Sequence, residues 1–299
     1  MRNIYLVAAA VIVAVTAGAA ATIFRGNPVP ENVVATLEGD PDRGAYFARL
    51  AGCIACHTNE SGGGDLLAGG PPLKTPFGTF YGPNITPDPA TGLGAWSLND
   101  FARALRHGIS PEGEPYYPAF PYTFYSKFTD QDIADLWAAM KTVPNADTPS
   151  KPQDLKFPFD QRWALRGWQN LFFDSETFQD DPTRSESWNR GKYIVTGPAH
   201  CGACHTPRNP LGASDAELAL HGAGGLPGGE RSPPITPSVL GERGWTENNL
   251  AFGLRFGTKP NGDVLGGSMG EVIRDGTSWL FDEDLRAIAH YLLNNDDTE

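Results

Sequence analysis

All four cysteines of this 299-residue chain occur in two short motifs, CIACH at residues 53–57 and CGACH at residues 201–205. In each motif the two thiols are one helical turn apart, which suits two thioether bonds to the vinyl groups of one haem. The histidine that follows can present its imidazole to the iron. The sequence therefore predicts two covalently bound haem c groups. The attachment residues are Cys53, Cys56, Cys201 and Cys204, and the proximal iron ligands are His57 and His205.

Other uses of paired cysteines fit this sequence less well. A disulfide between cysteines at this spacing would not require the histidine twice. Zinc sites built from two Cys-x-x-Cys pairs usually bring the pairs much closer together in the chain. A thioredoxin-like redox motif needs a βαβ pattern, and we find none. Haem attachment is therefore the interpretation we adopt.

The two motifs belong to two copies of one longer unit. RGAYFARLAGCIACHT (43–58) matches RGKYIVTGPAHCGACHT (190–206), with one extra residue in the second copy. WSLNDFARALRHG (96–108) matches WTENNLAFGLRFG (245–257) in the same order along the chain. Repetition of this kind predicts tandem domains. We expect domain 1 at residues 40–145 and domain 2 at residues 186–295.

Helical signals dominate both copies. Ser97 with Asp100 three residues later is a variant of the capping box, and Gly108 is a helix stop. A second apolar stripe at helical spacing follows Thr129 and ends at Met140. Because we identify no convincing strand, the expected fold class is all-α.

The segment between the domains, residues 146–185, is rich in aromatic side chains. A flexible linker would lack such residues. We therefore expect this connector to pack across both domains. The aromatic residues concerned are Trp163, Trp168, Phe172 and Phe173.

The N-terminus carries 21 residues without a charge, from Ile4 to Phe24, preceded by Arg2. This length is sufficient to cross a bilayer, so residues 1–25 are expected to form a transmembrane anchor. The alternative is a secretory signal cleaved among the small residues 17–21. Both interpretations export the rest of the chain, and residues 26–39 are expected to be a short tether.

The formal net charge of -12 argues against a nucleic-acid partner. Phosphate binding needs clustered lysine and arginine, and the chain has no such cluster. An acidic surface favours a basic docking partner instead.

With these features in place, the chain resembles the class I c-type cytochromes, specifically the multihaem cytochrome subunits of membrane-bound periplasmic dehydrogenases such as the alcohol dehydrogenases. The resemblance covers nearly all of residues 40–295. It is carried by RGAYFARLAGCIACHT, ALRHGISPEGEPYYPAFPY, GPAHCGACHTPRN and GSMGEVIRDGTSWLFDEDLRAIAHYL. Those subunits usually have three such domains, whereas this chain has two.

The resemblance implies one-electron transfer on the periplasmic side of the bacterial inner membrane. It also implies that a proline carbonyl orients each proximal histidine. Pro83 would serve His57, and Pro233 or Pro234 would serve His205.

Class I haems usually take a methionine sulfur as the sixth iron ligand. Met269 lies in a glycine-rich loop where the resemblance places this ligand, so we assign it to haem 2. Residue-by-residue alignment puts Phe120 at the matching position of domain 1. A phenyl ring cannot ligate iron, so haem 1 must have a different sixth ligand from haem 2 or an open sixth position.

Two other side chains are candidates for haem 1. Met140 lies on the apolar stripe of its helix, where core packing is expected. His107 is the candidate ligand we retain, although it aligns with Phe256 in domain 2. A five-coordinate or water-bound iron is the remaining alternative.

We expect a membrane-anchored dihaem cytochrome that relays electrons. The donor would be a dehydrogenase or quinol-oxidising complex, and the acceptor an oxidase or soluble cytochrome. The alternative is a haem enzyme, peroxidase-like or thiosulfate-dehydrogenase-like, that uses haem 1 without a methionine ligand. No separate catalytic residues are identified, and no output module accompanies the domains as a ligand sensor would require.

Overall fold

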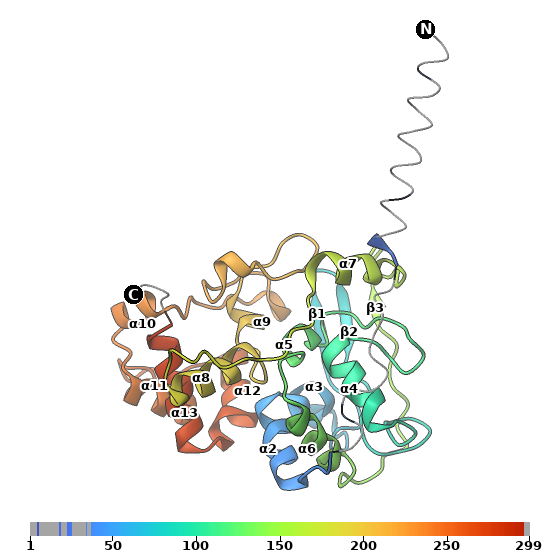
Figure 1. Ribbon diagram of the computed structural model, residues 1–299, viewed down its shortest axis with the longest axis horizontal. Coiled ribbons are helices and arrows are strands. Elements are labelled where there is room, and N and C mark those ends of the chain that lie inside the picture. Colours follow the sequence, from blue (N-terminus) through green and yellow to red (C-terminus); the bar gives the residue numbers. More distant parts are fainter. Residues whose placement is uncertain (1–4, 6–17, 19–22, 26–33, 35–36, 296–299) are drawn as a thin grey trace.

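The computed structural model describes residues 5, 18, 23–25, 34 and 37–295. Two helical lobes lie side by side, with domain 1 drawn in blue and green and domain 2 in orange and red (Figure 1). The predicted anchor or signal segment falls almost wholly outside the described residues. Within the part of the chain that is described, no helix is both long and apolar enough to traverse a bilayer.

Domain 1 is built from short helices and a β-hairpin. Its elements are α2 (Pro41–Leu50), α3 (Cys53–His57), the 3-10 turn η1 (Glu60–Gly62), β1 (Pro72–Thr75), β2 (Gly78–Tyr81), α4 (Leu98–His107), α5 (Tyr122–Tyr125) and α6 (Asp130–Met140).

Domain 2 repeats this helical order and adds one helix, α10, before the counterpart of α4. Its elements are α8 (Glu186–Thr196), α9 (Gly202–His205), η2 (Ala216–Leu218), η3 (Pro227–Gly229), α10 (Pro237–Glu242), α11 (Glu247–Phe256), α12 (Ser268–Asp275), η4 (Thr277–Trp279) and α13 (Asp282–Leu293).

The predicted helix signals are confirmed at α4 and its counterpart α11. Ser97 and Asp100 form a reciprocal capping box, in which each side chain accepts a hydrogen bond from the other residue's backbone amide. Thr246 and Asn249 make the same arrangement at the start of α11. Both helices end at a glycine with positive φ, and Gly108 is the one that ends α4. The duplicated sequence therefore gives duplicated helix ends.

In each domain the first helix crosses the last one at very close range, α2 against α6 and α8 against α13. A β-carbon on Gly44 would overlap the carbonyl of Asp135. One on Gly191, the equivalent residue of α8, would overlap the carbonyl of Ala287. Glycine is needed at both crossings because the helix backbones touch there.

The expectation of an all-α fold is wrong in one part of the described chain. Strands β1, β2 and β3 (Asp154–Leu155) form an antiparallel sheet in that order. In the β1–β2 hairpin Thr75 pairs with Gly78 at the turn, and between β2 and β3 Thr79 pairs with Asp154. The strands have only two to four residues, too few for a clear alternating pattern. The third strand also comes from the connector, so its pairing is non-local.

The connector packs across both domains, as predicted. Its helix α7 (Ala164–Phe172) carries Gln169, whose side-chain amide donates to the carbonyls of His107 and Gly108 in domain 1. The Trp168 indole donates to the carbonyl of Leu211 in domain 2 at 2.9 Å. The connector therefore links the two domains through side-chain hydrogen bonds.

The expected tether also touches domain 1 where it is described. Val34 is buried, and the carbonyl of Glu38 accepts a hydrogen bond from the Gln131 side-chain amide of α6 at 2.8 Å. The end of this segment is thus held against helix α6 rather than standing free.

Candidate functional site

The two Cys-x-x-Cys-His motifs occupy equivalent short helices, α3 and α9. In each, the first cysteine is half-buried against the apolar core and the second is exposed. None of the four cysteines forms a disulfide. The helical turn is closed by backbone hydrogen bonds, from Cys56 to Gly52 at 3.2 Å and from His205 to Cys201 at 3.0 Å. Both thiols of a motif therefore lie on one short turn, as thioether attachment requires.

A threonine directly after each motif fixes the loop that follows. The Thr58 hydroxyl accepts a hydrogen bond from the Leu67 amide at 3.0 Å. Thr206 accepts one from the Leu220 amide at 3.1 Å. Both threonines are buried, so the two motifs are held by the same local device.

Each motif histidine contacts a proline carbonyl through one ring nitrogen. His57 Nδ1 lies 2.7 Å from the Pro83 oxygen, and His205 Nδ1 lies 2.8 Å from the Pro233 oxygen. The prediction for Pro83 is confirmed, and in domain 2 the partner is Pro233 rather than Pro234. Because Nδ1 donates to the carbonyl, Nε2 is left with a free lone pair for a metal.

Burial lowers the pKa of both histidines, and the proline carbonyls oppose this shift in part. The lowered pKa keeps the imidazoles neutral near pH 7. The neutral imidazole is the form that binds a metal. The electrostatic environment and the hydrogen bond therefore favour the same ligand state.

The loop that carries Pro83 packs directly against the backbone of the first motif. A β-carbon on Gly82 would overlap the Cys56 carbonyl and would stand 3.3 Å from His57 Nδ1. Any side chain there would push Pro83 away from the imidazole. The donor set and this cradle fit a haem attached at Cys53 and Cys56 with His57 as its proximal ligand.

Burial raises the pKa of the Cys53 and Cys201 thiols to about 12, and the second cysteine of each motif adds to the shift. These sulfurs are thus disfavoured as thiolates. A thioether carries no charge, so the same position accepts an attached sulfur without a buried anion.

The two attachment segments meet where the domains touch. The Cε1 atom of His200, directly before Cys201, would lie 3.5 Å from a β-carbon on Gly52, directly before Cys53. The His200 ring also meets Tyr125 edge to face, with centroids 5.7 Å apart. The two predicted haem sites are therefore neighbours.

Met269 lies in the first turn of α12, not in a loop as expected. Its side chain is half-buried and packs against the apolar core. Gly267 is the N-cap of this helix, and the Glu230 carboxylate accepts a hydrogen bond from the Ser268 amide at 3.2 Å. Helix α12 also contacts α3 of domain 1.

Phe120, the domain 1 counterpart of Met269, lies within an aromatic cluster. Its ring centroid is 5.6 Å from Tyr116, 6.3 Å from Tyr122 and 5.8 Å from Tyr125. These are ordinary distances for edge-to-face ring packing. The methionine position of one domain is thus the centre of a ring cluster in the other.

The two alternative ligands for haem 1 differ in their surroundings. Met140 is 3% exposed and belongs to the core, which confirms core packing as its role. His107 is half-buried at the end of α4, and its imidazole makes no hydrogen bond to the described residues. Burial and the charges of Arg106 and Arg103 lower the pKa of His107, which keeps this imidazole neutral as well.

Two features of the site were missed by the sequence reasoning. The first is the junction at His200, which lies against Gly52 and whose Nδ1 is 3.0 Å from the Pro198 carbonyl oxygen. The buried hydroxyl of Tyr122 has no hydrogen-bond partner among the described residues. The position of His200 directly before a motif was a signal for the first feature, and we find none for the second.

Comparison with models of known protein families gives no match. Comparison with curated proteins does. A dihaem c-type cytochrome of Cereibacter sphaeroides is 43% identical over 278 residues, which cover 91% of this chain and 92% of that protein. The cytochrome c subunit of a quinone-dependent alcohol dehydrogenase from Gluconacetobacter polyoxogenes is 41% identical over 261 residues. A nicotinate dehydrogenase subunit from Pseudomonas putida is 41% identical over 251 residues.

The last two relatives are longer than the matched region. The match covers 84% of this chain in both cases, but 54% of the alcohol dehydrogenase subunit and 21% of the nicotinate dehydrogenase subunit. This chain therefore spans about half or less of their length, whereas it spans nearly all of the first relative.

Proposed function

Because this chain belongs to the dihaem c-type cytochromes, we propose that it carries single electrons between redox proteins through two covalently bound haem c groups. Cys53 and Cys56 would attach haem 1, with His57 as proximal ligand. Cys201 and Cys204 would attach haem 2, with His205 as proximal ligand and Met269 as sixth ligand. Each haem supplies one-electron chemistry, and the protein supplies attachment, ligation and docking.

The observation that carries this proposal is the pair of proximal histidines with their proline carbonyls. Each histidine follows a Cys-x-x-Cys turn, is kept neutral by burial and has one nitrogen engaged. The proximity of the two segments at Gly52 and His200 supports transfer between the haems within one molecule.

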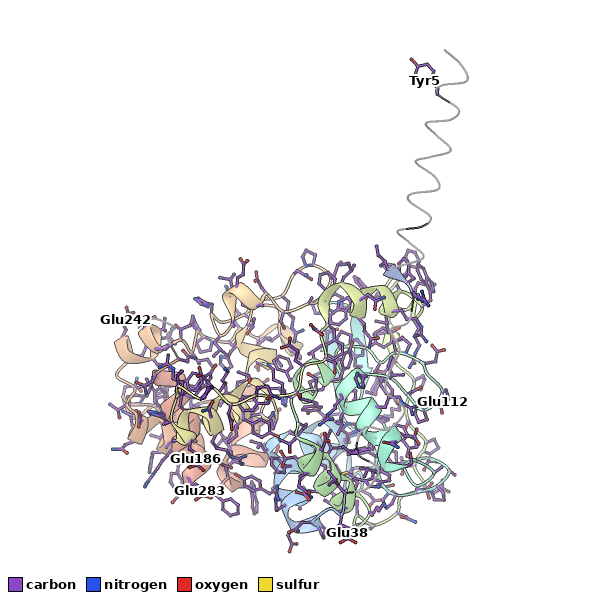
Figure 2. All side chains as sticks on the ribbon, viewed as in Figure 1. Tyr5, Glu38, Glu112, Glu186, Glu242 and Glu283 are labelled. Atoms are coloured by element: carbon purple, nitrogen blue, oxygen red, sulfur yellow. The ribbon has the colours of Figure 1, made fainter. Side chains whose placement is uncertain are left out.

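We propose a dehydrogenase as electron donor, because relatives of this chain are subunits of alcohol and nicotinate dehydrogenases. A quinol-oxidising complex is the alternative donor. An oxidase or a soluble cytochrome would accept the electrons. Exposed glutamates stand around the rim of both domains in Figure 2, which suits a basic partner surface. The labelled examples are Glu38, Glu112, Glu186, Glu242 and Glu283.

We also propose that the protein works on the periplasmic side of the inner membrane, held there by the uncharged run from Ile4 to Phe24. A cleaved signal would leave the same domains in the same compartment. The length of the run supports the anchor, because typical signal cores are shorter, about 7–15 residues.

A second candidate function concerns haem 1. Phe120 stands where a thioether would be expected, and it is packed among tyrosine rings. A haem without a methionine ligand could bind an external ligand, as in a peroxidase-like or thiosulfate-dehydrogenase-like enzyme. His107 is the residue we propose as sixth ligand if the site is closed.

Absorption and electron paramagnetic resonance spectra of the purified oxidised and reduced protein test both proposals. The relay predicts two low-spin haems, one with histidine and methionine ligands and one with a different ligand set. Two identical haems would overturn our assignment for domain 1. Carbon monoxide binding to one haem would favour the enzyme instead.

A further inference from the structure

The chain between residues 23 and 25 is clamped onto helix α7 of the connector. The Asn170 side-chain amide donates to the carbonyls of Ile23 and Arg25, at 2.5 Å and 2.8 Å. The Phe24 ring meets Trp163 at a centroid distance of 5.3 Å. A β-carbon on Gly167 would come within 2.5 Å of the Phe24 ring, so no larger residue fits beneath it.

This clamp lies at the end of the uncharged run that we propose as the membrane anchor. The run ends at Phe24, so α7 grips the chain at the point where it would leave the bilayer. The surface of α7 and its approach segment would then stand at the level of the lipid headgroups. Helix α7, in yellow-green, lies on the outer edge of domain 1 next to this point (Figure 1).

The connector exposes several large apolar side chains near this clamp. Phe157 is 80% exposed, Trp163 is 64% exposed and Leu171 is 58% exposed. Tryptophan is enriched at the interface between membrane and water, and phenylalanine and leucine form the apolar face of segments that lie in that interface. In water, an exposed apolar side chain of this kind gains no stabilisation from burial.

The charge of the same segment is opposite to that of the whole chain. Residues 156–172 contain three basic residues, Lys156, Arg162 and Arg166, and one acidic residue, Asp160. The chain as a whole has a formal net charge of -12. Lys156 and Arg162 are exposed, whereas Arg166 donates to the Gly113 carbonyl at 2.7 Å. Basic side chains near a membrane attract anionic headgroups.

From these observations we propose that the segment 156–172 is a lipid-contacting surface, which seats the connector on anionic headgroups beside the anchor. This inference rests on the proposed membrane anchoring. Phe157 and Trp163 enter the headgroup region, and Lys156 and Arg162 pair with phosphate groups. Contact of this surface with the lipid fixes the orientation of both domains relative to the bilayer, because the connector is hydrogen-bonded to both.

A photo-crosslinking experiment on the full-length haem-loaded chain tests this surface. Phe157 is replaced by p-benzoyl-phenylalanine, and the protein is reconstituted in phosphatidylcholine vesicles with and without phosphatidylglycerol. The matched control places the same group at Phe281, which is 60% exposed at the junction of the domains, where it stacks on Tyr46. We expect a several-fold excess of lipid adducts at position 157 over position 281.

The charged residues are tested with Lys156→Gln and Arg162→Gln. The preference for phosphatidylglycerol adducts should fall about fivefold for each basic side chain removed. If the protein floats with the vesicles but position 157 gives no lipid adduct, or only protein adducts, the lipid-contacting surface is refuted and the anchor stands. If the protein does not float at all, the anchor is refuted, and this inference with it.

Discussion

Tyr46 of domain 1 donates a hydrogen bond to the carboxylate of Asp284 in domain 2, at 2.5 Å. The equivalent residues of the duplication make the reciprocal bond, since Tyr193 of domain 2 donates to Asp132 of domain 1. Each carboxylate also pairs with an arginine of its own domain, Arg190 in one case and Arg43 in the other. The interface between the domains is therefore symmetric at the level of single side chains.

Removing these hydroxyls should loosen the interface. Tyr193→Phe is expected to lower the free energy of unfolding by about 2 kcal/mol, because a buried hydrogen bond to a charged group is lost. Tyr46→Phe should lower it by about 1 kcal/mol, because Tyr46 is half-buried and solvent weakens its bond. Urea unfolding followed by circular dichroism measures both. Tyr81→Phe is the control, since its hydroxyl makes no hydrogen bond to the described residues, and an equal loss there would contradict this account.

The same pair makes stability depend on alkaline pH. Burial and the partner aspartates raise the pKa of Tyr46 and Tyr193 above the ordinary value. Their contribution is complete below pH ~10, where tyrosines of the unfolded chain are still protonated. It is lost as pH rises further, by at most about 1.4 kcal/mol per pH unit for each tyrosine and by less for half-buried Tyr46.

Urea midpoints at pH 8 and above pH 10 check this dependence. Other tyrosines with raised pKa, such as Tyr116 and Tyr122, destabilise every variant at high pH. The double variant Tyr46→Phe with Tyr193→Phe should therefore lose less stability than the unmodified protein. Equal losses of stability in the double variant and the unmodified protein would show that the interface tyrosines do not contribute to the pH dependence.

Met269→Ala should lower the reduction potential of haem 2 and leave haem 1 unchanged. A methionine sulfur stabilises reduced iron relative to ligands without it, and axial ligands shift haem potentials over a range of about 0.8 V. A redox titration followed by absorption measures both haems. Met140→Leu is the matched control, because that methionine is in the core. Unchanged potentials in Met269→Ala would remove it as a ligand.

Phe120→Met should make haem 1 resemble haem 2. The aligned position would regain a thioether, so the potential of haem 1 is expected to rise and its spectrum to become that of a haem with histidine and methionine ligands. Phe120→Leu removes the ring without adding sulfur. An identical response in both variants would mean that loss of ring packing, and not ligation, causes the change.

His107→Phe tests the sixth ligand that we propose for haem 1. The new residue is the one that domain 2 carries at the matching position, Phe256. We expect haem 1 to change from low spin to five-coordinate high spin, as seen by electron paramagnetic resonance. Haem 2 in the same sample is the internal reference. A haem 1 signal that stays low spin would exclude His107.

The proposed attachment residues follow from the sequence because their relation is local. The two cysteines and the histidine of each motif lie within five consecutive residues, so one helical turn determines their relation. The duplication likewise identified Phe120 as the unusual position, because an alignment needs no coordinates. Helix ends at Ser97 and Gly108 followed from the same local rules.

Only the tertiary structure decided the contacts between segments far apart in the chain. It selected Pro233 over Pro234, added β3 of the connector to the hairpin, and brought His200 against Gly52. The interface tyrosines are 61 and 238 residues from their carboxylate partners. Pairings of this kind depend on how whole helices pack, and composition and periodicity do not determine that. The sequence by itself determined the two Cys-x-x-Cys-His motifs that we propose attach the haems, and folding determined that these motifs are neighbours.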